Sequence, residues 1–474
     1  MENYKYLLKN IGLLTISNFG SKILIFLLVP LYTSVLSITE YGAYDLVQTT
    51  INLLIPILTI NISDAVIRFC IEKENDPRKV FSIGLFIILK AWITFALLVL
   101  INNIFDLLPF IKEYSTYMLL LFLVMSIYQL CSQFARGIDK IFDVAVAGIV
   151  TSITMISFNI IFLLGFKWGI TGFFMANILS SLSGVIYLTI RIKIYTSITS
   201  IKRPKSLIKD MKNYSRPLTL NSVSWWITNV SDRYVVTWMC GIAVNGLYSI
   251  AYKIPSIMNV FQSIFLQAWQ ISAVKSFDNK DKEKFFSNIY TIYNLLMVLL
   301  CSVMIIFIKI IAVFMFAKDF YDAWVFVPIL LISNVFGAMS GFIGGVFSAV
   351  KDTRIYSYST TIGAIINLIL NIILIKIYGA MGAAIATTVS YFIVWLMRLI
   401  NARKYITLDV NIKKDLIVYV ILVLQAIFII NATTNSIYFI ECFLFIVIIS
   451  LYLKEFKQIF IKAKNVYNKR MLRR

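Results

Sequence analysis

The sequence lacks histidine entirely and has only five cysteines among its 474 residues. No two cysteines form a C-x-x-C pair; they are Cys70, Cys131, Cys240, Cys301 and Cys442. Histidine and cysteine are the usual ligands of zinc and the usual redox groups, so this composition predicts no metal site and no cofactor. We interpret the cysteines as small apolar packing residues.

Catalytic motifs are missing as well. The chain has no H-E-x-x-H, no G-x-S-x-G and no P-loop, so we predict no catalytic residue and no enzyme activity. A membrane-embedded glycan transferase would need acidic residues at the outer surface. The predicted outer loops are short and offer only Asp106, Glu113, Asp319 and Asp322.

Charged residues are scarce, at 14% of the chain, whereas 60% of the residues are hydrophobic and the mean hydropathy is +0.85. An ordinary globular protein has roughly a quarter of its residues charged. A helix crosses the hydrocarbon core with about 20 apolar residues, and such runs recur along the chain. The sequence therefore predicts an all-α membrane protein with about 14 transmembrane helices.

The net charge of +21 carries an orientation signal. Thirty-five of the 44 Lys and Arg residues fall in the termini and loops on one side of the predicted spans, and only five fall on the other. The positive-inside rule places the basic side, with both termini, in the cytoplasm. Because these residues are spread over short loops and form no single patch, we predict no nucleic-acid partner.

Three motifs recur at offsets of 204, 213 and 210 residues: 41–45 (YGAYD) and 245–249 (NGLYS), 134–139 (FARGID) and 347–352 (FSAVKD), and 167–177 (KWGITGFFMAN) and 377–387 (IYGAMGAAIAT). Their common order predicts a duplicated six-helix unit, with two bundles related by a parallel pseudo-two-fold axis. The alternative is that such hairpins arose independently.

The duplication sets the predicted domains. We expect a first six-helix bundle over 1–190, a cytoplasmic linker with a short surface helix over 191–216, and a second bundle over 217–405. Two extra transmembrane helices and a basic cytoplasmic tail fill 406–474. Gly337, Gly341 and Gly345 form a small-residue stripe that predicts close packing of another helix.

Four cations lie within predicted spans: Lys22, Lys90, Arg233 and Lys253. Inserting each one costs about 2.5–3.5 kcal/mol, so such residues usually face a wet cavity or an ionic partner and serve a function. We predict that these four line a cationic central cavity. An excess of positive charge favours an anionic substrate over a cation.

The span at 217–239 also carries a polar and aromatic face, on which Arg233 follows Ser222, Trp226 and Asn229 at helical spacing. Indole rings stack on sugars, amides and hydroxyls bond to sugar hydroxyls, and guanidinium binds phosphate. This face predicts contacts to a glycan attached to phosphate. The alternative makes the tryptophan an interfacial residue and the arginine part of a structural ion pair.

Acidic residues near these spans have structural interpretations. We expect Asp232 to pair with a cation on another helix, for which Lys253 is a candidate, and Asp64 to pair with Arg68 within one helix. The second pair is also a candidate latch for a cytoplasmic gate. Asp45, at the outer end of the same span as Asp64, is expected to be solvated.

Several stretches resemble one family. NIGLLTISNFGSKILIFLLVPLYTSVLSITEYGAYDL with SDAVIRF, ARGIDK, and SDRYVV with NGLYSIAYKIP resemble the oligosaccharide flippases of the polysaccharide transporter family, the Wzx-type proteins. The resemblance implies the multidrug, oligosaccharidyl-lipid and polysaccharide exporter (MOP) fold, with two six-helix bundles and two extra helices. It places the cationic cavity at Lys22, Arg233, Lys90 and Lys253.

The resemblance implies a flippase in the bacterial cytoplasmic membrane. Its substrate would be an undecaprenyl-diphosphate-linked repeat unit for O-antigen, capsule or exopolysaccharide, moved by alternating access. Expected partners are the lipid-linked oligosaccharide, membrane lipids, a polysaccharide polymerase and a chain-length regulator, with H⁺ or Na⁺ as the coupling ion. The alternatives are a MATE-like drug or cation antiporter and a non-transporting component of a polysaccharide assembly complex.

Overall fold

The structure is a computed structural model that describes residues 26–72, 74–106, 109–197, 204–277, 281–350, 352–432, 434 and 436–455. These residues form helices and turns with no strand among them, which confirms the all-helical class. Among them, eight helices are long and apolar enough to cross a membrane, or nine if one bent pair counts as a span. The count of about 14 stays a prediction.

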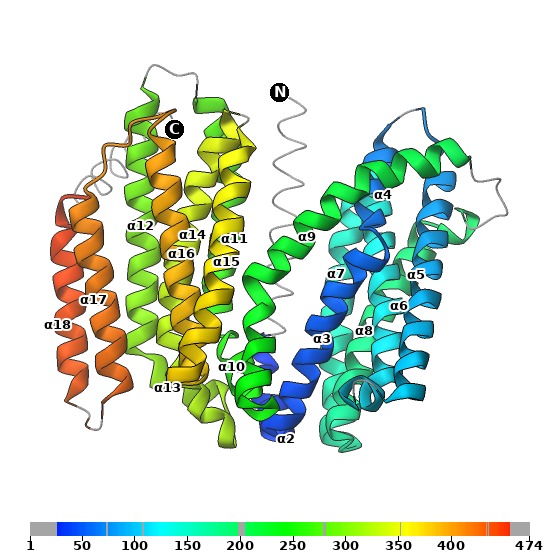
Figure 1. Cartoon of the computed structure of the whole chain (residues 1–474), viewed down its shortest axis with the longest axis horizontal. Coiled ribbons are helices and arrows are strands. Elements are labelled where there is room, and N and C mark those ends of the chain that lie inside the picture. Colours follow the sequence, from blue (N-terminus) through cyan, green and yellow to red (C-terminus); the bar gives the residue numbers. More distant parts are fainter. Residues whose placement is uncertain are drawn as a thin grey trace, which may run out of the picture. The chain divides into compact units, whose positions relative to one another are not determined.

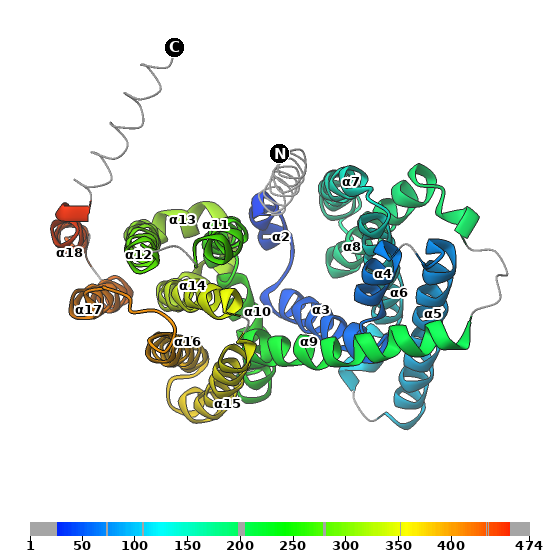
Figure 2. The same ribbon diagram turned by 90° about the horizontal axis from the view of Figure 1, so that it is seen from above.

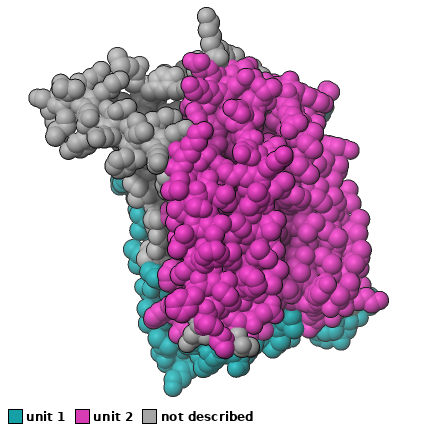
Figure 3. Space-filling model, turned by 90° about the vertical axis from the view of Figure 1, so that its left-hand side faces the viewer, with its two compact units in different colours: residues 1–234, 242–246, 316–319 teal, residues 235–241, 247–315, 320–474 magenta. Residues whose placement is uncertain are grey.

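The chain divides into two compact units, which Figure 3 colours separately. Unit 1 contains residues 1–234, 242–246 and 316–319, and unit 2 contains residues 235–241, 247–315 and 320–474. The two units are defined by the contacts within each of them, whereas the predicted bundles are defined by the repeated motifs. The predicted bundle boundaries therefore stay predictions.

Unit 1 is a helical bundle built around two apolar clusters. One cluster joins α4, α5 and α6 around Val66, Phe81 and Leu130, and the other joins α3, α5 and α6 around Ile51, Phe95 and Phe122. The elements of this unit are α2 (Val29–Val35), α3 (Ile38–Leu58), α4 (Ile62–Ile71), α5 (Pro77–Phe105), α6 (Pro109–Gly137), α7 (Ile141–Asn159), η1 (Ile160–Gly165), α8 (Gly169–Arg191), η2 (Ile194–Ser197) and most of α9 (Lys205–Cys240).

The predicted span at 41–63 is a broken helix. α3 begins at a capping box, in which the Ser37 hydroxyl accepts from the Glu40 backbone and the Glu40 carboxylate accepts from the Ser37 backbone. It ends where Ile60 and Asn61 adopt positive φ, and α4 then continues at 54° to it. The break places the Asn61 side chain at a corner between the two helices.

Helix α9 is longer than the span predicted at 217–239. Residues 205–216, part of the linker over 191–216 for which we expected a short surface helix, are its first turns, and no glycine or proline interrupts them before Pro217. In both Figure 1 and Figure 2, α9 (green) runs along α3 and α4. At its start, Met211 is fully buried in the cluster of α4 and α5.

Unit 2 has α14 at its centre, in contact with α11, α12, α16 and α17 (Figure 2). α11 packs on the glycine stripe of α14, but the atoms nearest these glycines belong to side chains and not to helix backbone: the Trp269 ring lies on Gly345, and its Nε1 donates to the Phe342 carbonyl at 2.8 Å. The elements are the second half of α10 (Ile242–Ala251), whose first half belongs to unit 1, then α11 (Pro255–Ser276), α12 (Lys282–Ile306), α13 (Ile308–Met315), most of η3 (Lys318–Phe326), α14 (Val327–Ala349), α15 (Thr353–Tyr378), α16 (Ala380–Ala402), α17 (Ile412–Ile430) and α18 (Ile437–Leu451).

A reciprocal contact joins the two occurrences of the first repeated motif. A Cβ on Gly42 would lie 2.2 Å from the Ile242 carbonyl oxygen, and a Cβ on Gly246 would lie 2.1 Å from the Ile38 carbonyl oxygen. The contact is symmetric, because Ile38 and Ile242 are 204 positions apart, and so are Gly42 and Gly246. Such a symmetric contact is what a duplication predicts, and only glycine permits so close an approach.

This contact predicts a large effect of one methyl group. We expect Gly42→Ala to destabilise the protein by about 1–3 kcal/mol, the usual cost of overpacking, because helix backbone blocks the new Cβ. Gly165→Ala is the matched control, since nothing lies within 4 Å of its Cβ position. Thermal unfolding of the purified protein measures both, and equal midpoints for the two variants would contradict the close contact.

Candidate functional site

An ion pair links α9 to α3 within unit 1. Arg233 Nη1 donates to Asp45 Oδ1 at 2.5 Å, and the two side chains are only 17% and 11% exposed. The Asp45 residue is buried, so the expectation that it is solvated was wrong. Asp45 is buried because another helix covers the face of α3 next to Gly42, and a carboxylate on a covered face requires a cation.

Further polar contacts continue along the two helices away from the ion pair. The Tyr234 and Thr50 hydroxyls bond to each other, and the Trp226 indole donates to the Thr49 carbonyl at 3.0 Å. Because residue numbers rise along α3 as they fall along α9, the helices are antiparallel here. These contacts fix the register of α9 on α3.

The third level of contact lies at the corner between α3 and α4. The Asn61 amide donates to Asp64 Oδ2 at 2.7 Å and to the Ser222 hydroxyl at 3.4 Å. Gln133 of α6 donates to Asp64 Oδ1 at 2.8 Å. The broken span thus brings α4, α6 and α9 together around one carboxylate.

The predicted pair of Asp64 with Arg68 was therefore wrong. Arg68 instead forms a 3.2 Å pair with Glu72, one turn further along, and both of these side chains are exposed. The reason is geometric: the carboxylate of Asp64 faces the corner, where two amides satisfy it, while Arg68 lies on the exposed side of α4.

The predicted polar face of α9 is present, but its residues serve packing. Ser222, Trp226 and Arg233 all contact α3 or Asn61, whereas the Asn229 amide donates to the Trp225 carbonyl of its own helix at 2.7 Å. Trp226 is 9% exposed and lies edge-on to the Tyr234 ring. It therefore presents no open face on which a sugar can stack in this arrangement, contrary to the sequence interpretation.

The structure describes three of the four predicted cations, and each has different surroundings. Lys90 is exposed on α5, and its ammonium group lies 4.3 Å from the centre of the Phe86 ring. Lys253 is partly buried between α10 and α11 in unit 2, and Lys22 lies outside the described residues. Asp232 is buried in unit 1 and accepts from the backbone of Arg233. Its pairing with Lys253 stays a prediction.

One buried arginine was not predicted from the sequence. Arg398 of α16, which we counted with the cytoplasmic loops, is 4% exposed inside unit 2. Its guanidinium donates to the Ser359 and Thr360 hydroxyls and to the Ser340 carbonyl, and it lies 4.1 Å from the centre of the Tyr356 ring. All of these acceptors are neutral. Its position one helical turn from the end of α16 made it look like a loop residue.

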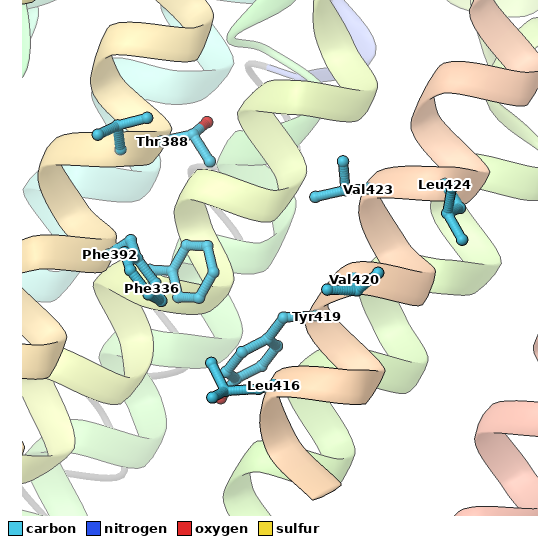
Figure 4. Close-up of a pocket in the computed structure, with 9 residues that line it drawn as sticks. Phe336, Thr388, Phe392, Leu416, Tyr419, Val420, Val423 and Leu424 are labelled. Carbon is cyan, nitrogen blue, oxygen red and sulfur yellow. The ribbon is translucent and has the colours of Figure 1, made fainter. Parts of the chain in front are cut away.

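Unit 2 also contains an apolar cavity of about 330 Å³ between α14, α16 and α17 (Figure 4). The rings of Phe336, Phe392 and Tyr419 lie together at its wall. The Thr388 hydroxyl at its edge donates to backbone carbonyls. The cavity offers hydrocarbon contacts and no group that would bind an anion.

Residues 7–270 match the family described as polysaccharide biosynthesis protein. The chain belongs to this family. It is 24% identical over 285 residues to the probable low-salt glycan biosynthesis flippase Agl15 of Haloferax volcanii, with 59% of each protein covered. It is 26% identical over 205 residues to the membrane protein MJ1375 of Methanocaldococcus jannaschii, covering 42% of this chain and 47% of that protein. The chain thus matches 59% of the first relative's length and 47% of the second's.

Solved structures show the same fold. The lipid II flippase MurJ in an inward closed conformation has a TM-score of 0.69 at 17% identity, with 95% of this chain and 99% of that chain covered. An inward-facing multidrug resistance transporter of the MATE family has a TM-score of 0.69 at 16% identity, covering 81% and 94%. The polysaccharide biosynthesis protein described here therefore has the MOP superfamily fold, as the resemblance implied.

The ion pair between α3 and α9 can be tested by a double-mutant cycle. Asp45→Asn or Arg233→Gln leaves a largely buried charge without its partner, so each should cost about 1.5–3 kcal/mol, and the double variant should cost less than their sum. Arg68→Gln removes an exposed pair and should cost at most about 1 kcal/mol. Unfolding of the purified protein measures all four. Additive effects would contradict the pairing.

Proposed function

We propose that this protein is a flippase for lipid-linked oligosaccharides. Its substrate is an oligosaccharide on a polyprenyl diphosphate, such as undecaprenyl diphosphate, which passes from the cytoplasmic to the outer leaflet for surface polysaccharide biosynthesis. The observation that carries the proposal is the family match over 7–270 on a chain with the MOP fold. The relative named as a glycan biosynthesis flippase supports the same substrate class.

Basic side chains favour an anionic substrate. Asp45 is neutralised by Arg233, and the Arg398 guanidinium keeps its positive charge inside unit 2, because its acceptors are neutral groups. A diphosphate brings about two negative charges, and an arginine or lysine binds phosphate through charge-assisted hydrogen bonds. Lys22, Lys90 and Lys253 remain the proposed cations for the headgroup.

The role of Arg233 changes in this proposal. Its guanidinium is engaged by Asp45, so we assign it to holding α9 against α3 and not to binding the diphosphate. Movement of α9 along α3 would have to break the ion pair, the tyrosine–threonine contact and the indole contact. In alternating access, these three contacts would keep the two helices together as one body.

The site of action follows from the orientation signal. With both termini in the cytoplasm, the basic loops face the compartment in which the lipid-linked oligosaccharide is assembled, in a cytoplasmic membrane. A polymerase and a chain-length regulator would act on the translocated product.

A cation antiporter of the same fold is the second candidate, and the burial of Asp45 favours it, because such a protein needs carboxylates inside the membrane. The ion pair argues against it, since a paired carboxylate does not attract a cationic drug. A dye-efflux assay separates the two candidates.

The lysine variants provide the test in cells. In a strain deleted for this gene, the wild-type protein should restore surface polysaccharide, while Lys253→Ala and Lys22→Ala should cause lipid-linked oligosaccharide to accumulate in the membrane. Loss of one charge-assisted hydrogen bond of about 1.5–3 kcal/mol predicts a loss of substrate affinity of roughly tenfold or more.

Lys112→Ala is the matched control, because this lysine is exposed and pairs with Asp106 outside the predicted spans. Normal polymer in the deletion strain, or efflux of a cationic dye that depends on the protein while polymer is unaffected, would contradict the flippase proposal.

A further inference from the structure

The two C-terminal helices form a hairpin that has no counterpart in the predicted repeat. α17 and α18 pack on α12 inside unit 2, and α18 lies at the edge of that unit in both ribbon views (Figures 1 and 2). The outer face of α18 is apolar and exposed, with Phe439, Phe443 and Ile446 among its side chains. Two carboxyl groups nevertheless lie inside this hairpin.

The first of these, Asp415, belongs to a network at the start of α17. Asp415 Oδ1 accepts from the Asn294 amide at 3.0 Å and lies 3.4 Å from the Tyr452 hydroxyl. The Tyr419 hydroxyl completes the network by donating to Asn294 Oδ1 at 2.8 Å. Two donors, Asn294 of α12 and Tyr452 just after α18, therefore support one oxygen of this carboxyl group, and Tyr419 of α17 holds the Asn294 amide in place.

The second carboxyl group, that of Glu441 on α18, has no such support. Glu441 is 0% exposed, and neither of its carboxyl oxygens has a hydrogen-bond partner among the described residues. The Gln425 amide nitrogen donates to the Glu441 backbone carbonyl at 3.4 Å, and the Gln425 amide oxygen accepts from the Ser302 hydroxyl at 2.7 Å. The Gln425 amide is thus the polar group next to Glu441, and both of its polar atoms already have these partners.

The titratable groups on the packed helices do not supply a cation to Glu441. They are Lys282, Glu283, Lys284, Tyr290, Tyr293 and Cys301 on α12, Lys413, Lys414, Asp415 and Tyr419 on α17, and Tyr438 and Cys442 on α18, with Tyr452 just beyond it. Lys282, Lys284 and Lys413 lie in the first turns of α12 and α17, whereas Ser302 and Gln425, which lie near Glu441, are close to the other ends of these helices. Lys309, just beyond α12, donates to the Ala432 carbonyl at 3.1 Å and lies against the Trp324 ring. Lys414 pairs with Glu455 at the opposite end of the hairpin.

An ionised carboxylate that is fully buried, without a hydrogen-bond donor and without a cation, is among the least favourable groups inside a protein. A protonated carboxyl group avoids this penalty and gains an O–H donor, for which the second lone pair of the Gln425 amide oxygen is an available acceptor. Ionisable groups inside membrane-spanning segments are also rare, and proton relays are one of their recognised roles.

We propose that Glu441 is a proton-binding site. In the packed hairpin its carboxyl group carries the proton, and when α18 moves away from α12 and α17 the group releases H⁺ to water and becomes a carboxylate. Return of α18 requires a proton from water, so docking of the hairpin and proton binding are one event.

Infrared spectroscopy of the purified full-length protein in lipid nanodiscs tests the site directly. At neutral pH the wild type should show a carbonyl band of a protonated carboxyl group that Glu441→Gln removes and that Glu441→Asp shifts. Glu113→Gln, which changes an exposed carboxylate, should leave the band unchanged. The proposal is overturned if the wild-type and Glu441→Gln spectra agree in this region, or if only Asp415→Asn removes the band.

A transport measurement extends the test and rests on the proposed function. In proteoliposomes with an imposed proton gradient, the wild-type rate of lipid movement should depend on the direction of the gradient, and Glu441→Gln should lose this dependence. An unchanged dependence in Glu441→Gln would overturn the proton site. If the wild type moves no lipid, the proposed function fails, and the infrared result decides the proton site by itself.

Discussion

The ion pair of Asp45 with Arg233 is the contact on which the arrangement of unit 1 depends. Neither charge is tolerable alone at such low exposure, so the pair fixes which face of α9 meets α3. With this face fixed, the Trp226 indole reaches the Thr49 carbonyl, and the Asn61 amide reaches the Ser222 hydroxyl. Removing either partner would leave the other charge buried without compensation, which costs far more than the pair itself contributes.

The fold could be predicted from the sequence because its signals are periodic and global. Apolar runs, the bias of basic residues to one side and the repeat offsets each average over many positions, and the comparisons confirm the fold they indicated. The GxxxG rhythm around Gly341 likewise predicted a close helix contact. Helical periodicity does not say which helix covers a given face, however. For this reason the surroundings of several site residues were predicted wrongly.

Three residues show this limit. Asp45 looked solvated because its helix end was assumed to be open, Trp226 looked like a sugar platform because its own face was polar, and Arg398 looked like a loop residue from its position. In each case the deciding partner lies far away in sequence. The repeat did contain one usable signal: Gly42 and Gly246 are equivalent, and Asp45 follows Gly42 on the same helical face, so a neighbouring helix was to be expected there.

Transbilayer movement by the purified protein tests the central claim most directly. Proteoliposomes would contain a fluorescent oligosaccharide on polyprenyl diphosphate, or the same glycan on an uncharged polyprenol, and an impermeant quencher would report the leaflet. The account predicts that the protein moves the diphosphate much faster than the neutral lipid. Equal rates for both lipids, or no movement of either, would contradict an anionic lipid-linked oligosaccharide as the substrate.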